Sequence, residues 1–200
     1  DEDGKVFWES PWGRGRPGWH IECSAMSIKY LGNHFDIHCG GVDNIFPHHE
    51  NELAQSVSAT KGLFVNYWMH SEYLHIQGDK MSKTLGNFHK ISDLISEGFT
   101  AEEIRFTLLS AHYRSKLNFS LNQNQEARTA IKRITDIQQR LFELKDSAQT
   151  ESPMPDEFEE FVAALDDDLD TPKAFAIFFG WIRSMNNLLD KGEFMLSQIN

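Results

Sequence analysis

The order of glycines and apolar runs between residues 17 and 78 is the feature that most restricts the fold of this chain. "RPGWHIECSAMSIKYLGN" predicts a helix with Pro17 near its first turn and Gly32 at its end. "HFDIHCGG" then predicts a short strand, "PHHENELAQSVSATKG" a helix opened by Pro47 and closed by Gly62, and "NYWMHSEYLHIQG" one or two strands with a break near Ser71. Strand, glycine turn, helix and strand in this order are typical of a parallel βαβ unit, which binds ligands at the carboxyl ends of its strands.

The second half of the chain is charged and periodic, and we place the change of architecture between about residues 90 and 120. From "ISDLISEG" onward we predict helices. Thr100 and Glu103 have the spacing of a capping box. A bundle helix is predicted by the apolar stripe Ala127, Ile131, Ile134, Ile137 and Leu141. "TESPMP" predicts a turn, and "DEFEEFVAALDDD" and "TPKAFAIFFGWIRSMNNLLDK" predict two more helices, the second opened by Thr171 and Pro172.

Composition narrows the class of protein. With 40% hydrophobic residues in 200, the chain can bury a core. No run of eighteen apolar residues occurs and "DEDGKVFWES" does not suggest a signal peptide, so we expect a cytoplasmic protein without a membrane segment. Its two cysteines are too few for a disulfide framework. The net charge of -11 disfavours bulk affinity for nucleic acid, although a local basic patch is compatible with it. Because the chain starts without Met, we expect it to be a piece of a longer protein.

"IFPHHENELAQS" holds the first candidate site. Helix residues four apart lie about 40° apart around the axis, so His48 and Glu52 point the same way, while His49 and Glu50 point elsewhere. An imidazole and a carboxylate at this spacing can share one zinc ion, and a cysteine would add a thiolate ligand. Cys23, on the preceding helix, is the better donor, and Cys39 competes with it. The alternatives are a surface helix with a His–Glu hydrogen bond and a Cys23 that is only a small buried side chain.

The lysine loop, "GDKMSKTLGNF" at residues 78–88, holds the second candidate site. Lys80 and Lys83 are three residues apart with Ser82 between them, and glycines lie on both sides. A mobile loop of this kind can close on phosphate, because its ammonium groups stabilise negative charge and its hydroxyl can donate a hydrogen bond. A solvated basic turn or a surface hairpin is the alternative interpretation.

Taken together, these motifs resemble the cysteinyl-tRNA synthetases, which are class I aminoacyl-tRNA synthetases. "KMSKT" is similar to their KMSKS signature, and the likeness includes "GWHIECSAM", "FDIHCGGVDNIFPHHENELAQS", "YWMH" and "DDDLDTPKAF". The resemblance implies an α/β fold, the C-terminal half of a Rossmann-like parallel-sheet catalytic domain followed by helices. The implied domains are the end of an insertion at residues 1–16, the catalytic domain with its KMSK loop at 17–90, a stem-contact segment at 91–120 and a helical tRNA-binding bundle at 121–200.

The resemblance also implies the site residues. The family's zinc ligands fall on Cys23, His48 and Glu52, and this Zn²⁺ would bind the thiolate of the substrate L-cysteine. A metal that prefers sulfur can reject serine without an editing site. Trp19 is similar to the tryptophan that lines the amino-acid pocket, whereas the resemblance leaves a role of His38 and His49 in the site open.

For the second substrate, ATP with Mg²⁺, the resemblance implies nucleotide contacts at Gly40, Gly41 and Asp43. Lys83, with Lys80 and Ser82 nearby, would stabilise the pyrophosphate that leaves when cysteinyl adenylate forms. The acceptor of the cysteine would be tRNA(Cys), and we expect a monomer. Cys39 departs from the family, which carries a third glycine at this position.

Part of the family's machinery is expected upstream of Asp1, namely the HIGH-type ATP motif and the first zinc ligand. We therefore expect that these 200 residues alone form no adenylate. Two other functions remain open at this point. One is a paralogous ligase that joins cysteine to an amino sugar, and the other is a non-enzymatic, zinc-stabilised RNA-binding module.

Overall fold

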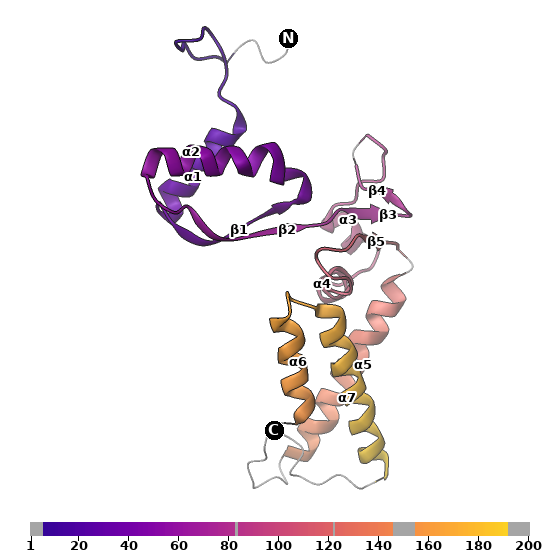
Figure 1. The fold of residues 1–200 in the computed structure, drawn as a ribbon. Helices are drawn as coiled ribbons and strands as arrows, with labels where there is room; N and C mark the ends of the chain where they lie inside the picture. The colour runs from indigo at the N-terminus through magenta and orange to yellow at the C-terminus, as the bar shows by residue number, and fades with distance from the viewer. Residues whose placement is uncertain (1–5, 83, 122, 146–154, 192–200) are drawn as a thin grey trace. The chain divides into compact units, whose positions relative to one another are not determined.

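The computed structural model describes residues 6–82, 84–121, 123–145 and 155–191, coloured along the chain in Figure 1. These residues belong to two compact units, unit 1 at Asp1–Glu72 and unit 2 at Tyr73–Asn200. Unit 1 is an α/β assembly, and unit 2 combines a small sheet with helices. Within the described ranges, no helix is both long and apolar enough to cross a membrane.

Unit 1 contains the parallel βαβ unit that the sequence predicts. Strand β1 (Phe35–Gly41) pairs in parallel with β2 (Val65–Ser71), in register from Phe35 opposite Val65 to Gly41 opposite Ser71. Helices α1 (Trp19–Leu31) and α2 (Glu50–Thr60) pack together on one side of this strand pair (Figure 1). Phe64 is fully buried beside the strands, and its ring contacts Phe35 and Trp68 edge-on or tilted.

The connection from β1 to α2 differs from the single helix that was predicted to open at Pro47. A 3-10 turn (Val42–Asn44) and a π-helical turn (Ile45–His49) precede α2, which begins only at Glu50. The reason is local, since the residue before a proline avoids the α region, and Phe46 is extended at φ -134° and ψ 131°. The C-terminal end of α2 also differs from the prediction. Lys61, in a left-handed conformation, terminates the helix one position before Gly62.

Unit 2 begins with a small sheet of order β4-β3-β5. Strands β3 (Leu74–Ile76) and β4 (Asp79–Lys80) form a hairpin whose two turn residues, Gln77 and Gly78, both have positive φ. Strand β5 (Leu117–Phe119) pairs with β3 in parallel. The prediction that the chain is helical from "ISDLISEG" onward was therefore wrong at β5. This strand is held by pairing with a strand about forty residues away in the sequence, and local propensity does not encode such an interaction.

Two short helices complete this part of unit 2. Helices α3 (Ile91–Ser96) and α4 (Ala101–Leu109) pack with the sheet around a core formed by Ile76, Leu94, Phe99, Ile104 and Phe119. The capping box is confirmed, since the Glu103 backbone N–H donates to Thr100 Oγ1 at 3.2 Å and the Thr100 N–H donates to the Glu103 carboxylate at 2.9 Å. Met81, from the lysine loop, also packs against this core.

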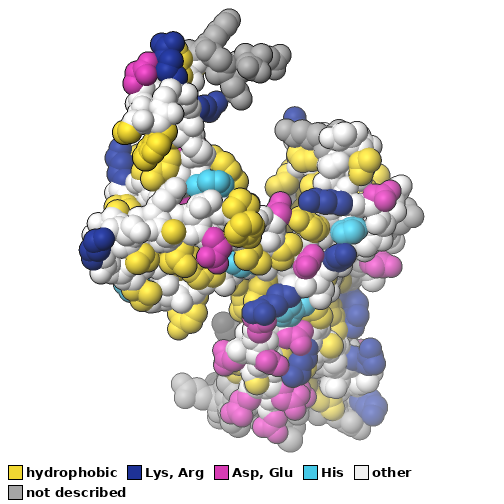
Figure 2. All heavy atoms as spheres, turned by 45° about the horizontal axis from the view of Figure 1, so that its top comes forward, with side chains coloured by type: hydrophobic (Ala, Val, Ile, Leu, Met, Phe, Trp, Pro, Cys, Tyr) yellow, Lys and Arg dark blue, Asp and Glu magenta, His cyan; other side chains and the backbone are white. Residues whose placement is uncertain are grey.

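The rest of unit 2 is helical, with α5 (Gln123–Lys145), α6 (Asp156–Asp166) and α7 (Thr171–Lys191). The predicted stripe of α5 faces the core, because Ala127 and Ile137 are buried, and Ile137 packs against Ile182 and Met185 of α7. Helix α7 starts at Thr171 as predicted. Figure 2 shows Asp and Glu side chains gathered over this helical part, where α6 opens with three acidic residues. "TESPMP" lies outside the described residues except for its last proline.

Candidate functional site

The structure brings the three predicted zinc ligands together in unit 1. Cys23 comes from α1, His48 from the π-helical turn and Glu52 from α2, and one potential ligand atom from each lies within 4.8 Å of the others. His48 and Glu52 are 4% and 0% exposed. Cys39, the competing donor, is exposed and belongs to neither group of potential metal ligands found in the described residues. Helix geometry therefore placed His48 and Glu52 on a common face correctly, although His48 precedes α2 itself.

Glu52 is a buried carboxylate with an unsatisfied oxygen. Its Oε2 accepts a hydrogen bond from His38 Nε2 at 2.9 Å. Its Oε1 lies 2.7 Å from His48 Nε2 but has no partner with hydrogen-bond geometry among the described residues. Burying a carboxylate without full pairing costs free energy, and a cation can remove that cost. The donor set of thiol, imidazole and carboxylate fits a tetrahedral Zn²⁺ with room for a further ligand.

His48 is oriented from its other side. Its Nδ1 lies 2.6 Å from Nδ1 of His20, and its ring stacks on Trp19 with centroids 3.4 Å apart and planes 5° apart. Metal-binding histidines typically use one ring nitrogen for the metal and the other for a hydrogen bond that fixes the ring. His48 has this arrangement, with Nε2 directed at Glu52. Trp19 is 52% exposed, so part of its ring remains available to a ligand.

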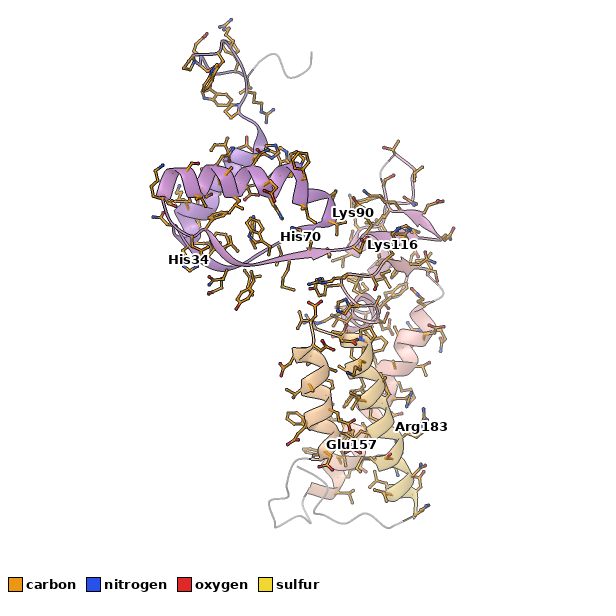
Figure 3. The ribbon with its side chains drawn as sticks, viewed as in Figure 1. His34, His70, Lys90, Lys116, Glu157 and Arg183 are labelled. Atoms are coloured by element: carbon orange, nitrogen blue, oxygen red, sulfur yellow. The ribbon has the colours of Figure 1, made fainter. Side chains whose placement is uncertain are left out.

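A second group of potential metal ligands, His38, His49 and Glu52, shares the Glu52 carboxylate. His49 Nδ1 also lies 2.7 Å from Nε2 of His70, which comes from β2 and is labelled in Figure 3. The expectation that His49 points away from the site was therefore wrong. The π-helical turn alters the helical spacing, and the two oxygens of Glu52 extend the site towards β1, so His48 and His49 both reach it.

Burial determines the protonation of this cluster. It lowers the pKa of His49 to about 4, with a smaller contribution from the neighbouring histidines His38, His70 and His48. It also lowers the pKa of His48, against the opposing charge of Glu52, and that of His70. The imidazoles of His48, His49 and His70 are thus neutral near pH 7, the form that binds metal. Burial, followed by the charges of Glu52 and Glu22, raises the pKa of the Cys23 thiol, so Cys23 needs a cation nearby to become a thiolate.

Of the two glycines at the end of β1, Gly40 is required by a close contact with a buried ring, whereas Gly41 lies against the exposed Asp43 side chain, which can move aside. A Cβ atom on Gly40 would lie 2.6 Å from Cε1 of His49, and one on Gly41 would lie 2.5 Å from Oδ1 of Asp43. Asp43 itself is exposed on the 3-10 turn. The three predicted nucleotide contacts therefore lie at the carboxyl end of a parallel strand, where such sheets bind ligands.

In unit 2, the lysine loop is mostly exposed. Lys80 ends β4, and its Nζ lies 3.5 Å from the ring centroid of Tyr73, a cation–π contact. The side chain of Asn87 contacts the backbone at Ser82 and at Lys80. Lys83, the lysine that the sequence favours for pyrophosphate, lies outside the described residues.

Sequence reasoning missed four residues of these sites, namely His20, His70, Tyr73 and Asn87. A usable signal existed for His70, since it lies opposite Gly40 at the carboxyl end of the second parallel strand. His20 follows the predicted pocket residue Trp19 directly. Tyr73 and Asn87 had no comparable signal, because their roles depend on contacts that appear only in the folded chain.

Two family models match the chain. The catalytic domain of class I (C) tRNA synthetases matches residues 1–129, and the DALR domain matches residues 160–199. The chain spans about 41% of the length of the curated relatives that it matches.

Curated relatives agree with this match, and solved structures are similar to the chain in fold. The chain is 47% identical to a cysteine–tRNA ligase of Brachyspira hyodysenteriae over 95% of its own length, and 49% identical to one of Escherichia coli over 94%, covering 41% and 40% of those proteins. Its fold is similar to the LeuRS chain of an Agrobacterium radiobacter LeuRS–tRNA–LeuAMS complex, with a TM-score of 0.71 at 15% identity over 98% of this chain and 31% of that one. A putative arginyl-tRNA synthetase of Campylobacter jejuni gives a TM-score of 0.53 at 13% identity, over 94% and 50% of the two chains.

Proposed function

The chain belongs to the class I (C) tRNA synthetase family, and from this premise we propose that it carries the amino-acid site and the phosphate loop of an enzyme that activates L-cysteine with ATP and transfers it to tRNA(Cys). The observation that carries the proposal is the group of Cys23, His48 and Glu52, in which a buried carboxylate oxygen lacks a hydrogen-bond partner within the described part of the chain. Such a group suits a sulfur-binding metal and therefore a substrate that bears a thiol.

Cys23, His48 and Glu52 would hold the Zn²⁺. When bound, Zn²⁺ supplies a Lewis acid that lowers the pKa of the substrate thiol and binds the resulting thiolate. The other residues of the cluster orient the ligands, since His38 holds one oxygen of Glu52 and His20 holds the far nitrogen of His48. The hydrogen bonds that orient the metal ligands would account for the polar side chains buried in this cluster.

Selection against serine follows from the same donor set. An apolar pocket distinguishes substrates that differ by one small group only about 10- to 200-fold. A thiolate-selective metal adds a larger difference, because the hydroxyl of serine is a poor ligand for it. Trp19, stacked on His48 with part of its ring exposed, would form the wall against which the cysteine side chain lies.

For adenylate formation, an oxygen of the cysteine carboxylate attacks the α-phosphorus of ATP. The new carboxyl O–P bond forms as the bond to pyrophosphate breaks. Gly40, Gly41 and Asp43 would contact the nucleotide, because they lie at the carboxyl end of a parallel strand. Lys80, Ser82 and Lys83, together with Mg²⁺, would stabilise the charge on the leaving pyrophosphate by positioning and electrostatics.

The tRNA would be bound by parts of unit 2, an assignment supported by the DALR match at residues 160–199. The acidic opening of α6 is an unfavourable surface for a polyanion, so the tRNA would approach by other faces. We propose that the enzyme acts as a monomer. Charging of tRNA(Cys) distinguishes this function from transfer of cysteine to an amino sugar.

The test is ATP–pyrophosphate exchange by a protein of full family length that contains this chain. Exchange is expected with cysteine and not with serine, together with one zinc per chain. Cys23→Ala should remove the zinc and the exchange, whereas Cys39→Ala, at an exposed cysteine outside both ligand groups, should retain both. Exchange that is absent with cysteine, or that proceeds without zinc, would contradict the proposal.

A further inference from the structure

We infer that Asn87 is a positioning residue that holds residues 80–82 of the lysine loop in the arrangement that meets the phosphates of ATP. The inference rests on the proposed function, because it assigns a role within the phosphate site. It concerns a residue that lies seven positions after Lys80 and that reaches back to it through its side chain.

The Asn87 side chain spans the start of the loop. Its Oδ1 accepts a hydrogen bond from the backbone N–H of Ser82 at 2.8 Å. Its Nδ2 donates to the backbone carbonyl of Lys80 at 3.2 Å. One amide therefore binds the peptide groups on both sides of Met81, which itself packs into the core of unit 2 and donates its N–H to the Leu74 carbonyl at 3.0 Å.

The rest of the loop turns back onto this anchor. The Leu85 N–H donates to Ser82 Oγ at 3.2 Å, and Gly86 has a φ of 70°, the left-handed conformation that glycine adopts readily. The reversal at Gly86 brings Asn87 alongside residues 80–82. The loop is thus fixed at Met81 and Asn87, while its intervening residues Thr84 and Leu85 are exposed.

Asparagine is suited to this position because its short side chain offers an acceptor and a donor on one plane. Alanine would remove both bonds. Aspartate would keep the acceptor for Ser82 but would place a second oxygen against the Lys80 carbonyl in place of the donor. The chemistry of the loop depends on where the Lys80 ammonium and the Ser82 hydroxyl lie, and a displacement of about 1 Å can reduce a rate by about 100-fold.

The experiment compares Asn87→Ala and Asn87→Asp with the unchanged protein and with Asn187→Ala, an exposed asparagine on α7. In ATP–pyrophosphate exchange without tRNA, Asn87→Ala should lower kcat/KM for ATP by about 10- to 100-fold while the KM for cysteine stays within about twofold. Hydrogen exchange at the Ser82 amide should become faster in Asn87→Ala and remain slow in Asn87→Asp. The control Asn187→Ala should match the unchanged protein in every measurement.

Two outcomes would overturn the inference. One is an unchanged kcat/KM for ATP in Asn87→Ala. The other is an equal loss for ATP and cysteine accompanied by a lower Tm, which would show general destabilisation. If the unchanged protein itself lacked cysteine-dependent exchange, the proposed function would fail, and the protection of the Ser82 amide would still show whether Asn87 holds residues 80–82 in place.

Discussion

The ligand cluster of unit 1 and the lysine loop of unit 2 are held in opposite ways. In the cluster, side chains from α1, β1, the π-helical turn, α2 and β2 contact one another around the buried His48, His49 and Glu52, and burial lowers the pKa of His49. In the loop, exposed residues depend on one amide and one core methionine. Selecting a substrate sulfur requires metal ligands that are held in place before the substrate binds. Stabilising the leaving pyrophosphate requires a loop that can move with it. Substitutions in the cluster should therefore have larger effects than substitutions in the loop.

The largest effect is expected from Glu52→Gln. The neutral amide removes the charged oxygen that faces Cys23 and His48, so zinc content should fall below one per chain, and kcat/KM for cysteine should fall by more than about 100-fold. Metal analysis and pyrophosphate exchange measure the two quantities. Glu50→Gln, at the exposed first residue of α2, is the matched control and should retain zinc and activity. Full zinc retention in Glu52→Gln would remove this residue from the ligand set.

A smaller effect, on stability, is expected from Gly40→Ala. The added methyl group would lie 2.6 Å from the buried ring of His49, which is packed too closely to move freely, so the free energy of unfolding should fall by about 1–3 kcal/mol. Denaturant unfolding measures the change. Gly62→Ala is the control, because nothing lies within 4 Å of its Cβ position, and it should change stability by less than about 1 kcal/mol. Equal stabilities of the two variants would show that the strand end can relax.

Acid should weaken the cluster more than the loop. The pKa of His49 is lowered from 6.5 to about 4 by burial, so between these pH values the unfolded chain binds more protons than the folded chain. The free energy of unfolding of the metal-free protein should therefore decrease as pH falls from about 6.5 towards 4, and His48 and His70 should contribute in the same direction.

Urea unfolding at pH 7 and at pH 5 tests this dependence, and hydrogen exchange locates it. Amides of α2 and β2 should lose protection at pH 5 beyond the intrinsic effect of pH, while the Ser82 amide should not. His49→Gln removes one of the titrating groups and should reduce the pH dependence. Stability that does not change between pH 7 and pH 5 would show that the folded cluster accepts protons freely.

The smallest effect is expected from Tyr73→Leu in unit 2. It removes the ring that lies 3.5 Å from the Lys80 ammonium, a contact worth about 0.5–1 kcal/mol at an exposed site, so the KM for ATP should change by no more than about fivefold. Tyr73→Phe keeps a ring and should behave as the unchanged protein does. Steady-state kinetics in ATP measure both. A change as large as that of Glu52→Gln would show that the loop is as tightly organised as the cluster.

Much of the local structure could be predicted from the sequence. The parallel βαβ pattern, the Thr100 capping box and the start of α7 at Thr171 follow from turn residues, caps and hydrophobic spacing, which act over a few neighbouring positions. The pairing of His48 with Glu52 follows in the same way from the i,i+4 geometry of a helix. These features depend on residues close to one another in the chain, so a linear sequence contains the information.

Only the tertiary structure decided which distant residues meet. His20 reaches His48 across 28 positions, His49 reaches His70 across 21, and β5 pairs with β3 across about forty. Such contacts depend on how elements pack and on where buried polar groups find partners, and neither is a property of a local segment. The sequence therefore determined the elements and the ligand types. The packing of α1, α2 and the two parallel strands determined that a buried, partly unsatisfied carboxylate lies between a thiol and two imidazoles.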